Sequence, residues 1–148
     1  MEIDELDKKI INTLIENSRL SYRQIAQKLK KSAATIMNRI NALEKNRIIK
    51  KYTTEVDYEK LGYDVPVIIE LRILKGKLFE IEKKIAKHPN VSIIYDTTGE
   101  LDATVIAKFK TRRAMDNFLK EIQTYDFIQR TNTKLILNTI KEENTKVQ

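Results

Sequence analysis

The side chains best suited to recognising another molecule lie between residues 32 and 45. Asn38 and Asn41 are three residues apart, which would place both side chains on one face of a helix. The opposite face is apolar, with Ile36, Ile40 and Leu43. An asparagine amide can bond bidentately to adenine, and the flanking Arg39 could bind guanine or phosphate. Small Ala33 and Ala34 would let a backbone approach closely. The alternative is an ordinary polar helix surface.

The basic residues are concentrated around this segment. The chain has 148 residues and a formal net charge of +7. Residues 19–52 hold ten Lys and Arg against the single acid Glu44, so this window alone is +9 and the remainder is −2. A patch of one sign is expected for a polyanionic partner. Charge by itself fits double-stranded DNA or an anionic membrane surface equally well.

Three helices would position that patch. The first carries an apolar stripe at 3.6-residue spacing, with Asp4 as its N-cap and the stripe residues Leu6, Ile10, Ile11, Leu14 and Ile15. The second, of about eight residues, opens with a capping box of Ser21 and Gln24. Ser32 and Thr35 begin the third, where free amides favour a phosphate. Ser32 could equally be only a cap. Two short helices after a supporting one predict a helix-turn-helix domain over residues 1–47.

The rest of the chain repeats a strand–helix–strand pattern. Alternating apolar residues predict a strand over 65–73, then a helix around 78–86 and a strand over 91–98. The order recurs 38 residues later with a strand over 103–109, a helix near 112–124 and a strand over 127–140. This βαββαβ order predicts a ferredoxin-like sheet over 63–148, so the fold class is α+β. Residues 48–62 would connect the domains, with a strand over 48–56.

One face of this sheet has nothing in the chain to cover it. The last predicted strand carries apolar residues on both sides, with Ile128, Leu135 and Leu137 on one and Ile136 and Ile140 on the other. Apolar residues on both faces require a partner, which predicts a homodimer formed through the sheet.

The composition excludes several kinds of site. Without cysteine there can be no disulfide, thiolate metal site or cysteine nucleophile. The single histidine, His88, precedes Pro89 at a predicted helix end and fits a cap better than catalysis. No Gly-rich phosphate loop or metal-ligand cluster is present, so we expect no catalytic residue, metal or cofactor. No apolar run reaches 18 residues and no signal peptide opens the chain. These features predict a cytoplasmic protein.

Several motifs together resemble the Lrp/AsnC (feast/famine) family of transcription regulators, archaeal members included. The resemblance extends nearly end to end, and its N-terminal part keeps its spacing across about 45 residues. It rests on Leu6-Asp7, Ile10, Leu14, Arg19-Leu20-Ser21, Ile25-Ala26, Leu29, Ser32, Thr35-Ile36, Arg39-Ile40, Leu43-Glu44, Ile48-Ile49, Tyr52, Leu61-Gly62, Gly99, Asp102 and Thr131-Asn132-Thr133.

The resemblance implies a DNA-binding regulator whose third helix is the recognition helix. Dimers or higher oligomers would bind pseudo-palindromic promoter sites on the nucleoid and could act on the transcription machinery. With the charge and spacing, it gives the DNA-binding candidates Arg19, Ser21, Arg23, Lys30, Lys31, Ser32, Ala33, Ala34, Thr35, Asn38, Arg39, Asn41, Lys50 and Lys51.

The resemblance also implies that the second domain is a RAM domain, which dimerises and often binds an amino-acid effector. The effector candidates are Gly99, Glu100, Leu101, Asp102, Thr131 and Thr133. For Gly99 and Asp102 the alternative is ordinary turn chemistry. Two other functions fit the domain plan: a siroheme-type decarboxylase, or an amino-acid sensor that does not bind specific DNA.

The sequence departs from the family pattern at three places. Lys30 and Lys31 occupy positions where the family usually has glycine and an apolar residue. A lysine with positive φ costs about 1 kcal/mol, so a differently shaped turn is expected. Arg47 stands where glycine is favoured, and Asn46 is expected to take the left-handed cap instead. Leu101 replaces an aromatic residue in the effector turn.

Overall fold

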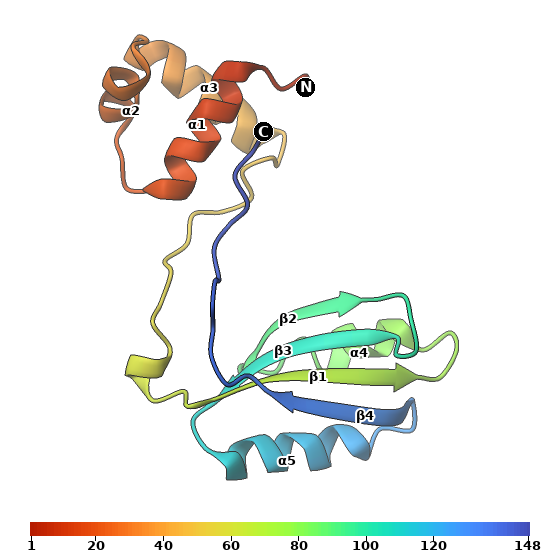
Figure 1. The fold of residues 1–148 in the computed structure, drawn as a ribbon. Helices are drawn as coiled ribbons and strands as arrows, with labels where there is room; N and C mark the ends of the chain where they lie inside the picture. Colours follow the sequence, from red (N-terminus) through yellow and green to blue (C-terminus); the bar gives the residue numbers. More distant parts are fainter. The chain divides into compact units, whose positions relative to one another are not determined.

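The chain packs as two units in a computed structural model that describes the backbone of residues 1–148 and every side chain except that of Glu82 (Figure 1). One unit comprises Met1–Glu55 together with Lys141–Gln148, and the other comprises Val56–Ile140. Residues 141–148 therefore pack with the N-terminal helices, whereas the sequence assigned them to the second domain.

The first unit is the expected bundle of three helices. Helix α1 spans Glu5–Glu16, α2 spans Tyr22–Leu29 and α3 spans Ala33–Lys45. The predicted N-caps Asp4, Ser21 and Ser32 all accept backbone N–H groups of their helices, and Ser21 forms its capping box with Gln24. The predicted stripes pack into one core, made of Ile10, Leu14, Ile25, Ala26, Ile36, Ile40 and Leu43.

Two helices of this unit end on left-handed residues that are not glycine. Lys30 after α2 has φ 53°, and Arg47 after α3 has φ 55°. In both, the next amide closes back on the helix, with Lys31 N–H donating to the Ala26 carbonyl and Ile48 N–H to that of Leu43, each at 2.9 Å. The expectation that Lys30 would give a different turn is wrong: the lysine itself adopts the conformation that glycine favours.

The expectation for Asn46 is also wrong. Asn46 has φ −85° and its side-chain amide donates to the Ala42 carbonyl at 2.8 Å. That bond holds Asn46 as a continuation of α3, so Arg47 has to take the left-handed position. A non-glycine residue there costs about 1–2 kcal/mol.

The second unit is the predicted βαββαβ fold. Strands β1 (Val65–Ile73), β2 (Val91–Asp96), β3 (Ala103–Phe109) and β4 (Ile128–Leu135) form an antiparallel sheet in the order β2-β3-β1-β4. Helix α4 spans Leu78–Lys84 and α5 spans Arg112–Gln123, and a short 3₁₀ helix, η1, covers Glu59–Leu61 before β1.

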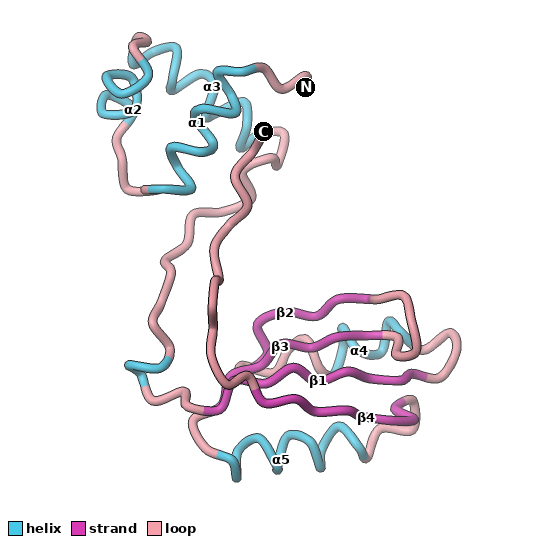
Figure 2. The backbone as a smooth tube through the Cα atoms, viewed as in Figure 1, coloured by secondary structure: helices cyan, strands magenta, loops and turns pink.

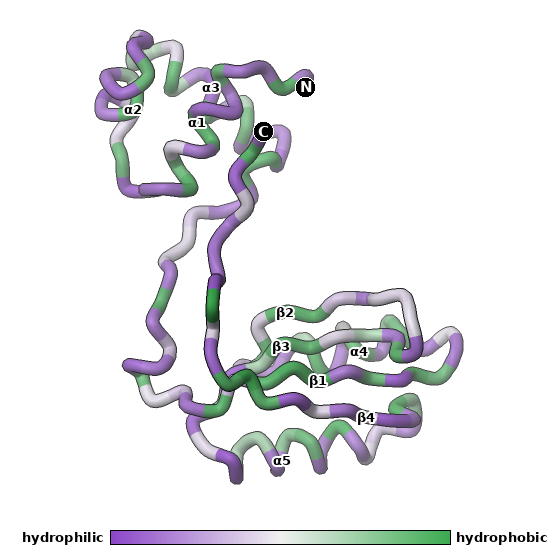
Figure 3. The backbone as a smooth tube through the Cα atoms, in the orientation of Figure 1, coloured by the Kyte–Doolittle hydropathy of each residue, from purple (hydrophilic) through white to green (hydrophobic). Residues whose placement is uncertain are grey.

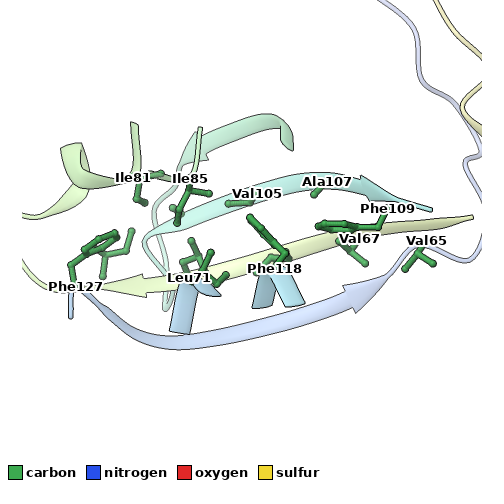
Figure 4. Packing of buried hydrophobic residues seen from close by; sticks show 14 residues of the cluster. Val65, Val67, Leu71, Ile81, Ile85, Val105, Ala107, Phe109, Phe118 and Phe127 are labelled. Atoms are coloured by element: carbon green, nitrogen blue, oxygen red, sulfur yellow. The ribbon is translucent and has the colours of Figure 1, made fainter. Parts of the chain in front are cut away.

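Both helices cover the same face of the sheet. Along β1 every second residue is buried, from Val65 to Ile73. These side chains pack with Ile81 of α4, Ile85 directly after α4 and Phe118 of α5, as the labelled sticks in Figure 4 show. The other face is only half-buried and carries Ile68 and Ile106, which pair across β1 and β3.

Three predicted strands are shorter or absent, and β2 is one of them because it ends at Asp96 instead of residue 98. Residues 48–56 form no strand and run as a loop (Figure 2), because no neighbouring strand pairs with them. β4 ends at Leu135 instead of Ile140, because β1 begins only at Val65 and offers no partner beyond that point. The last bond between the two strands runs from the Ile136 N–H to the Pro66 carbonyl. Leu137 and Ile140 consequently lie outside the sheet and are 89% and 94% exposed. Figure 3 shows that the chain after β4 alternates between hydrophobic and hydrophilic stretches.

Candidate nucleic-acid interface and effector turn

The outer face of α3 presents its polar side chains to solvent. Ala34, Asn38 and Asn41 are exposed. Neither asparagine side chain bonds to another residue that the structure describes, so both amides can bind an external partner. At the helix start, the Ser32 hydroxyl accepts the Thr35 N–H at 3.1 Å and lies 2.8 Å from the Thr35 hydroxyl. Ser32 is therefore a helix cap, which is one of the two roles that the sequence predicts. Phosphate binding by Ser32 stays a prediction.

Six cations surround α3 without internal charge partners. None of them forms an ion pair with another described residue, and all are exposed: Arg19, Arg23, Lys30, Lys31, Lys50 and Lys51. The left-handed Lys30 places two of these cations in the turn that joins α2 to α3. Ser21, between the two arginines, is occupied in its capping box. Unpaired cations need no internal bond to be broken before they can meet phosphates.

Arg39 differs from these six. Its guanidinium donates to Asp4 Oδ2 at 2.7 Å and to Asp7 Oδ2 at 3.2 Å, and the Asp7 side chain is fully buried. The pKa of Asp4 lies below its usual value because it accepts the Asp7 backbone N–H and faces Arg39. Asp4 in turn raises the pKa of Arg39. The structure thus places Arg39 in a link between α3 and α1.

The beginning of the linker is fastened to α3. The Tyr52 hydroxyl donates to Glu44 Oε1 at 2.7 Å. Partial burial and this bond raise the pKa of Tyr52 far above its ordinary value. Glu44 is the single acid among residues 19–52, and its carboxylate is directed at Tyr52. Lys50 and Lys51 are held between α3 and this anchor.

The turn of residues 97–102 is tied into the sheet through its own acids. Asp102 Oδ2 accepts the Ile73 N–H at 2.8 Å, and the Asp102 N–H donates to the Leu71 carbonyl at 2.8 Å. Glu100 Oε1 lies 2.9 Å from the Arg130 guanidinium, and the Glu100 carbonyl accepts Arg72. The turn therefore has a structural role whatever else it does.

The effector candidates do not all lie on one side. Thr131 and Thr133 pair with Leu71 and Ile69, whose side chains belong to the helix-covered face. The Thr131 hydroxyl accepts Gln123 of α5 at 3.3 Å. Arg72 and Arg130, the partners of Glu100, are cross-strand neighbours on the open face. The structure thus separates the two threonines from the contacts of Glu100.

Two features of this region were not apparent from the sequence. The amides of Gly99, Glu100 and Leu101 donate to no acceptor in the described part of the chain. A cavity of about 690 Å³ lies between α4 and β2, and its lining includes Asp96 and Ala103, which flank the turn. The remaining lining is mostly apolar, including Leu78, Phe79, Ile81 and Ile94. Tertiary packing of α4 on an edge strand creates this space, and no local motif encodes it.

The single histidine is a packing residue. The His88 ring lies 4.6 Å from that of Phe118, and His88 Nδ1 accepts the Asn90 N–H at 3.3 Å. No group of three or more potential metal ligands occurs among the described residues. No helix in this same set is both long and apolar enough to cross a membrane.

Comparison with known families and proteins agrees with this geometry. Residues 3–50 match a winged helix-turn-helix DNA-binding model, and residues 66–145 match the Lrp/AsnC ligand binding domain. An HTH-type transcriptional regulator of Pyrococcus furiosus is 47% identical over 97% of each chain. LysM of Saccharolobus solfataricus, also an HTH-type transcriptional regulator, is 36% identical over 93% of this chain and 95% of its own.

Solved structures give the same result. Bacillus subtilis LrpC superposes with a TM-score of 0.87 at 31% identity, covering 97% of this chain and 100% of that one. Escherichia coli AsnC gives 0.90 at 27% identity, covering 99% and 100%. A Neisseria meningitidis regulator described as an L-Met complex has the same fold, with a TM-score of 0.92 at 24% identity over 99% and 97% of the two chains.

These matches decide between the alternatives left open by the sequence. The relatives are transcriptional regulators and not enzymes, which argues against a decarboxylase. The helix-turn-helix match, together with relatives that are HTH-type transcriptional regulators, argues against an amino-acid sensor that does not bind specific DNA. This chain belongs to the Lrp/AsnC family of transcription regulators and joins a helix-turn-helix DNA-binding domain to a ligand-binding domain of the ferredoxin-like type.

Proposed function

We propose that α3 enters the major groove of DNA and reads bases with Asn38 and Asn41. The observation that carries this proposal is the exposed face of α3, whose two asparagine amides have no bond to the rest of the described chain. Ala33 and Ala34 at its start add little bulk, so the helix can approach the base edges closely. Ser32 and Thr35 would bind a phosphate at the helix N-terminus.

The six exposed cations around α3 would bind phosphates and hold the helix in register. Their freedom from internal ion pairs supports this role, since nothing has to be broken on binding. Arg39 does not join them in this proposal, because Asp4 and Asp7 already hold its guanidinium. Chromosomal DNA as a partner would place the protein on the nucleoid, in the cytoplasm.

The functional species would be a homodimer formed through the open face of the sheet. Ile68 and Ile106 lie there beside a polar group in which Glu70 bonds Lys134 and Asn132, each at 2.8 Å. These two bonds lower the pKa of Glu70, and the bond from Lys134 has the larger effect. A two-fold dimer would present two α3 helices to half-sites one helical turn apart or a multiple of it. Higher oligomers would add further half-sites.

An amino acid is the effector that the ligand-binding domain would take. Three consecutive free amides at Gly99, Glu100 and Leu101 suit a carboxylate, and the neighbouring cavity suits an apolar side chain. The L-Met complex of the Neisseria protein supports this class of ligand for the fold. Asp102 would hold the turn in place, and Thr131 and Thr133 are the least supported of the six candidates.

Asn38→Ala and Lys31→Ala test base reading and phosphate binding separately. We expect Asn38→Ala to narrow the affinity gap between a selected site and random DNA by ~1–3 kcal/mol. Lys31→Ala should weaken both DNAs alike. Six phosphate contacts predict a slope of about −5 in log K against log salt, and loss of one should flatten it by roughly 0.9.

The measurement is fluorescence anisotropy with both DNAs at several salt concentrations. Equal losses on both DNAs in Asn38→Ala would exclude base reading by that residue. Lys120→Ala is the matched control for charge, since this lysine lies on α5 and already pairs with Asp116 at 2.7 Å. A salt slope in Lys31→Ala identical to that of this control would exclude a phosphate contact at Lys31.

A further inference from the structure

The segment Lys141–Gln148, here called the strap, packs on α1, although the two segments lie at opposite ends of the sequence. The Asn12 side chain makes two bonds to one residue of the strap: its Nδ2 donates to the Val147 carbonyl at 2.9 Å, and its Oδ1 accepts the Val147 N–H at 2.8 Å. This pairing satisfies both backbone groups of Val147, as a neighbouring β-strand would. Val147 is half-buried, whereas the rest of the strap is exposed.

A charge contact supports the same docking. Asn12 and Glu16 are four residues apart and so lie on one face of α1. Glu16 Oε1 lies 3.2 Å from Lys146 Nζ of the strap, and Glu16 Oε2 lies 3.0 Å from Lys28 Nζ of α2. These two lysines lower the pKa of Glu16, and the hydrogen bond from Lys28 has the larger effect. One carboxylate thus joins the strap to two helices of the DNA-binding unit.

The strap also continues from β4, a strand that pairs with β1 and contacts the turn of residues 97–102. β4 carries Arg130, whose guanidinium bonds Glu100, and the chain from β4 reaches the strap after residues 136–140. The DNA-binding unit therefore has two covalent connections to the sheet unit, the linker at residues 55–56 and the strap at residues 140–141. A single linker would let the helices respond to the sheet only through assembly or chance contact, whereas a docked strap adds a direct connection.

We propose that Asn12 and Glu16 form a docking surface for the strap, and that the docked strap couples the sheet unit to the DNA-binding unit. A change at the turn of residues 97–102 would pass through Asp102 to β1, from β1 to the paired strand β4, and along the chain to the strap on α1. Because energetic coupling between two sites is reciprocal, DNA binding must also alter β4 and the turn. The coupling rests on the proposed DNA-binding function, but the docking does not.

The docking itself can be tested without DNA. The chain has no cysteine, so Glu16→Cys with Lys146→Cys introduces its only two thiols. A short bis-maleimide can bridge the separation left where a Glu and a Lys side chain met end to end, which is too long for a direct disulfide. We expect it to cross-link the two thiols within one chain, resolved by electrophoresis and intact mass. Glu5→Cys with Lys146→Cys is the control, since Glu5 is an exposed acid at the other end of α1 that pairs with Lys8. Equal cross-linking in both pairs, or cross-links only between chains, would overturn docking within the chain.

Amide hydrogen exchange then tests the coupling. Asn12→Ala should speed exchange at residues 145–148 by at least tenfold. Asn144→Ala, which changes an exposed strap side chain that bonds to no other described residue, should leave it unchanged. In the wild type, adding DNA should change amide exchange in β4 and in residues 97–102. The Asn12→Ala variant should still bind DNA, but DNA should no longer change exchange in those segments. Lys146→Glu, which reverses the charge facing Glu16, should act as Asn12→Ala does.

Two results would overturn the inference. Unchanged exchange at residues 145–148 in both Asn12→Ala and Lys146→Glu would overturn docking. A released strap with the DNA-induced change in β4 intact would overturn coupling. Absence of DNA binding in the wild type would instead contradict the proposed function, and the cross-linking result would still stand or fall separately.

Discussion

An arginine bonds a distant carboxylate in each unit, but the two pairs differ in burial. In the DNA-binding unit, Arg39 meets Asp7, whose side chain is 0% exposed. In the sheet unit, Arg130 meets Glu100, and the two side chains are 61% and 73% exposed. The first pair lies against a helix start, where Asp7 also accepts the Asp4 N–H at 3.2 Å. The second lies at the surface of a turn.

The difference teaches which charges build the fold and which remain available. A buried carboxylate has lost its hydration, so its partners must replace it. An exposed pair exchanges one set of hydrated contacts for another and gains little. The DNA-binding unit therefore uses Arg39 and Asp7 internally and leaves the six cations around α3 to solvent. The sheet unit depends instead on Asp102, the half-buried acid of its turn.

Replacing Asp7 should give the largest effect. Asp7→Ala removes the acceptor for the Asp4 N–H and leaves Arg39 with Asp4 alone. We expect the free energy of unfolding of the three-helix unit to fall by about 2–4 kcal/mol, combining a lost cap with a broken buried pair. Amide hydrogen exchange in α1–α3 measures this unit separately from the sheet.

Asp7→Asn separates the two contributions. It keeps an oxygen that can accept the Asp4 N–H but removes the charge facing Arg39, so it should cost less than Asp7→Ala. A loss below 0.5 kcal/mol in Asp7→Ala, within the range of ordinary surface changes of about ±0.5 kcal/mol, would remove the contrast between the two arginine pairs.

Replacing Asp102 should give an intermediate effect. Asp102→Ala leaves the Ile73 N–H without its acceptor at the end of β1, where a part-buried donor costs about 1–2 kcal/mol. Asp102→Asn retains an acceptor and should recover most of that loss. Thermal unfolding and exchange at Ile73 measure it. If Asp102→Ala were as stable as wild type, the acid would have no structural role and the turn would be freer for an effector than its bonds indicate.

Sequence patterns predict the parts of this molecule that are built locally. The caps at Asp4, Ser21 and Ser32 each depend on residues within three positions, and all three form as expected. Helical and strand periodicity likewise anticipate both cores. The concentration of cations over residues 19–52 is a sum over neighbours, so it also survives folding.

What could not be predicted depends on pairing across long separations. Arg39 is 32 residues from Asp7, and Asn12 is 135 residues from Val147. For Arg39 and Asp7 the sequence does hold an indication of pairing, because residues 1–18 have a net charge of −3 and residues 19–52 have a net charge of +9. Lys30 and Arg47 show a different limit: the closing amides of the helix ends outweigh a local preference of about 1 kcal/mol against positive φ.

Replacing Glu100 should give the smallest effect and makes the comparison sharpest. Glu100→Ala removes a carboxylate bond to Arg130 similar in length to the Asp7 bond to Arg39, but both partners are solvated. We expect a loss below about 0.5 kcal/mol in the unfolding free energy of the sheet unit, measured by urea denaturation at low and high salt. The Glu100 carbonyl that accepts Arg72 is untouched by this change.

A large loss in Glu100→Ala would mean that something covers the pair in solution. The open face of the sheet is the surface proposed for dimerisation, and Arg130 lies on it, so a partner subunit could exclude water there. In that case the loss should depend on protein concentration, since unfolding of a dimer does. Burial, rather than the number of bonds, would then again decide which arginine pair stabilises the protein, with the dimer supplying for Glu100 the burial that α1 and α3 supply for Asp7.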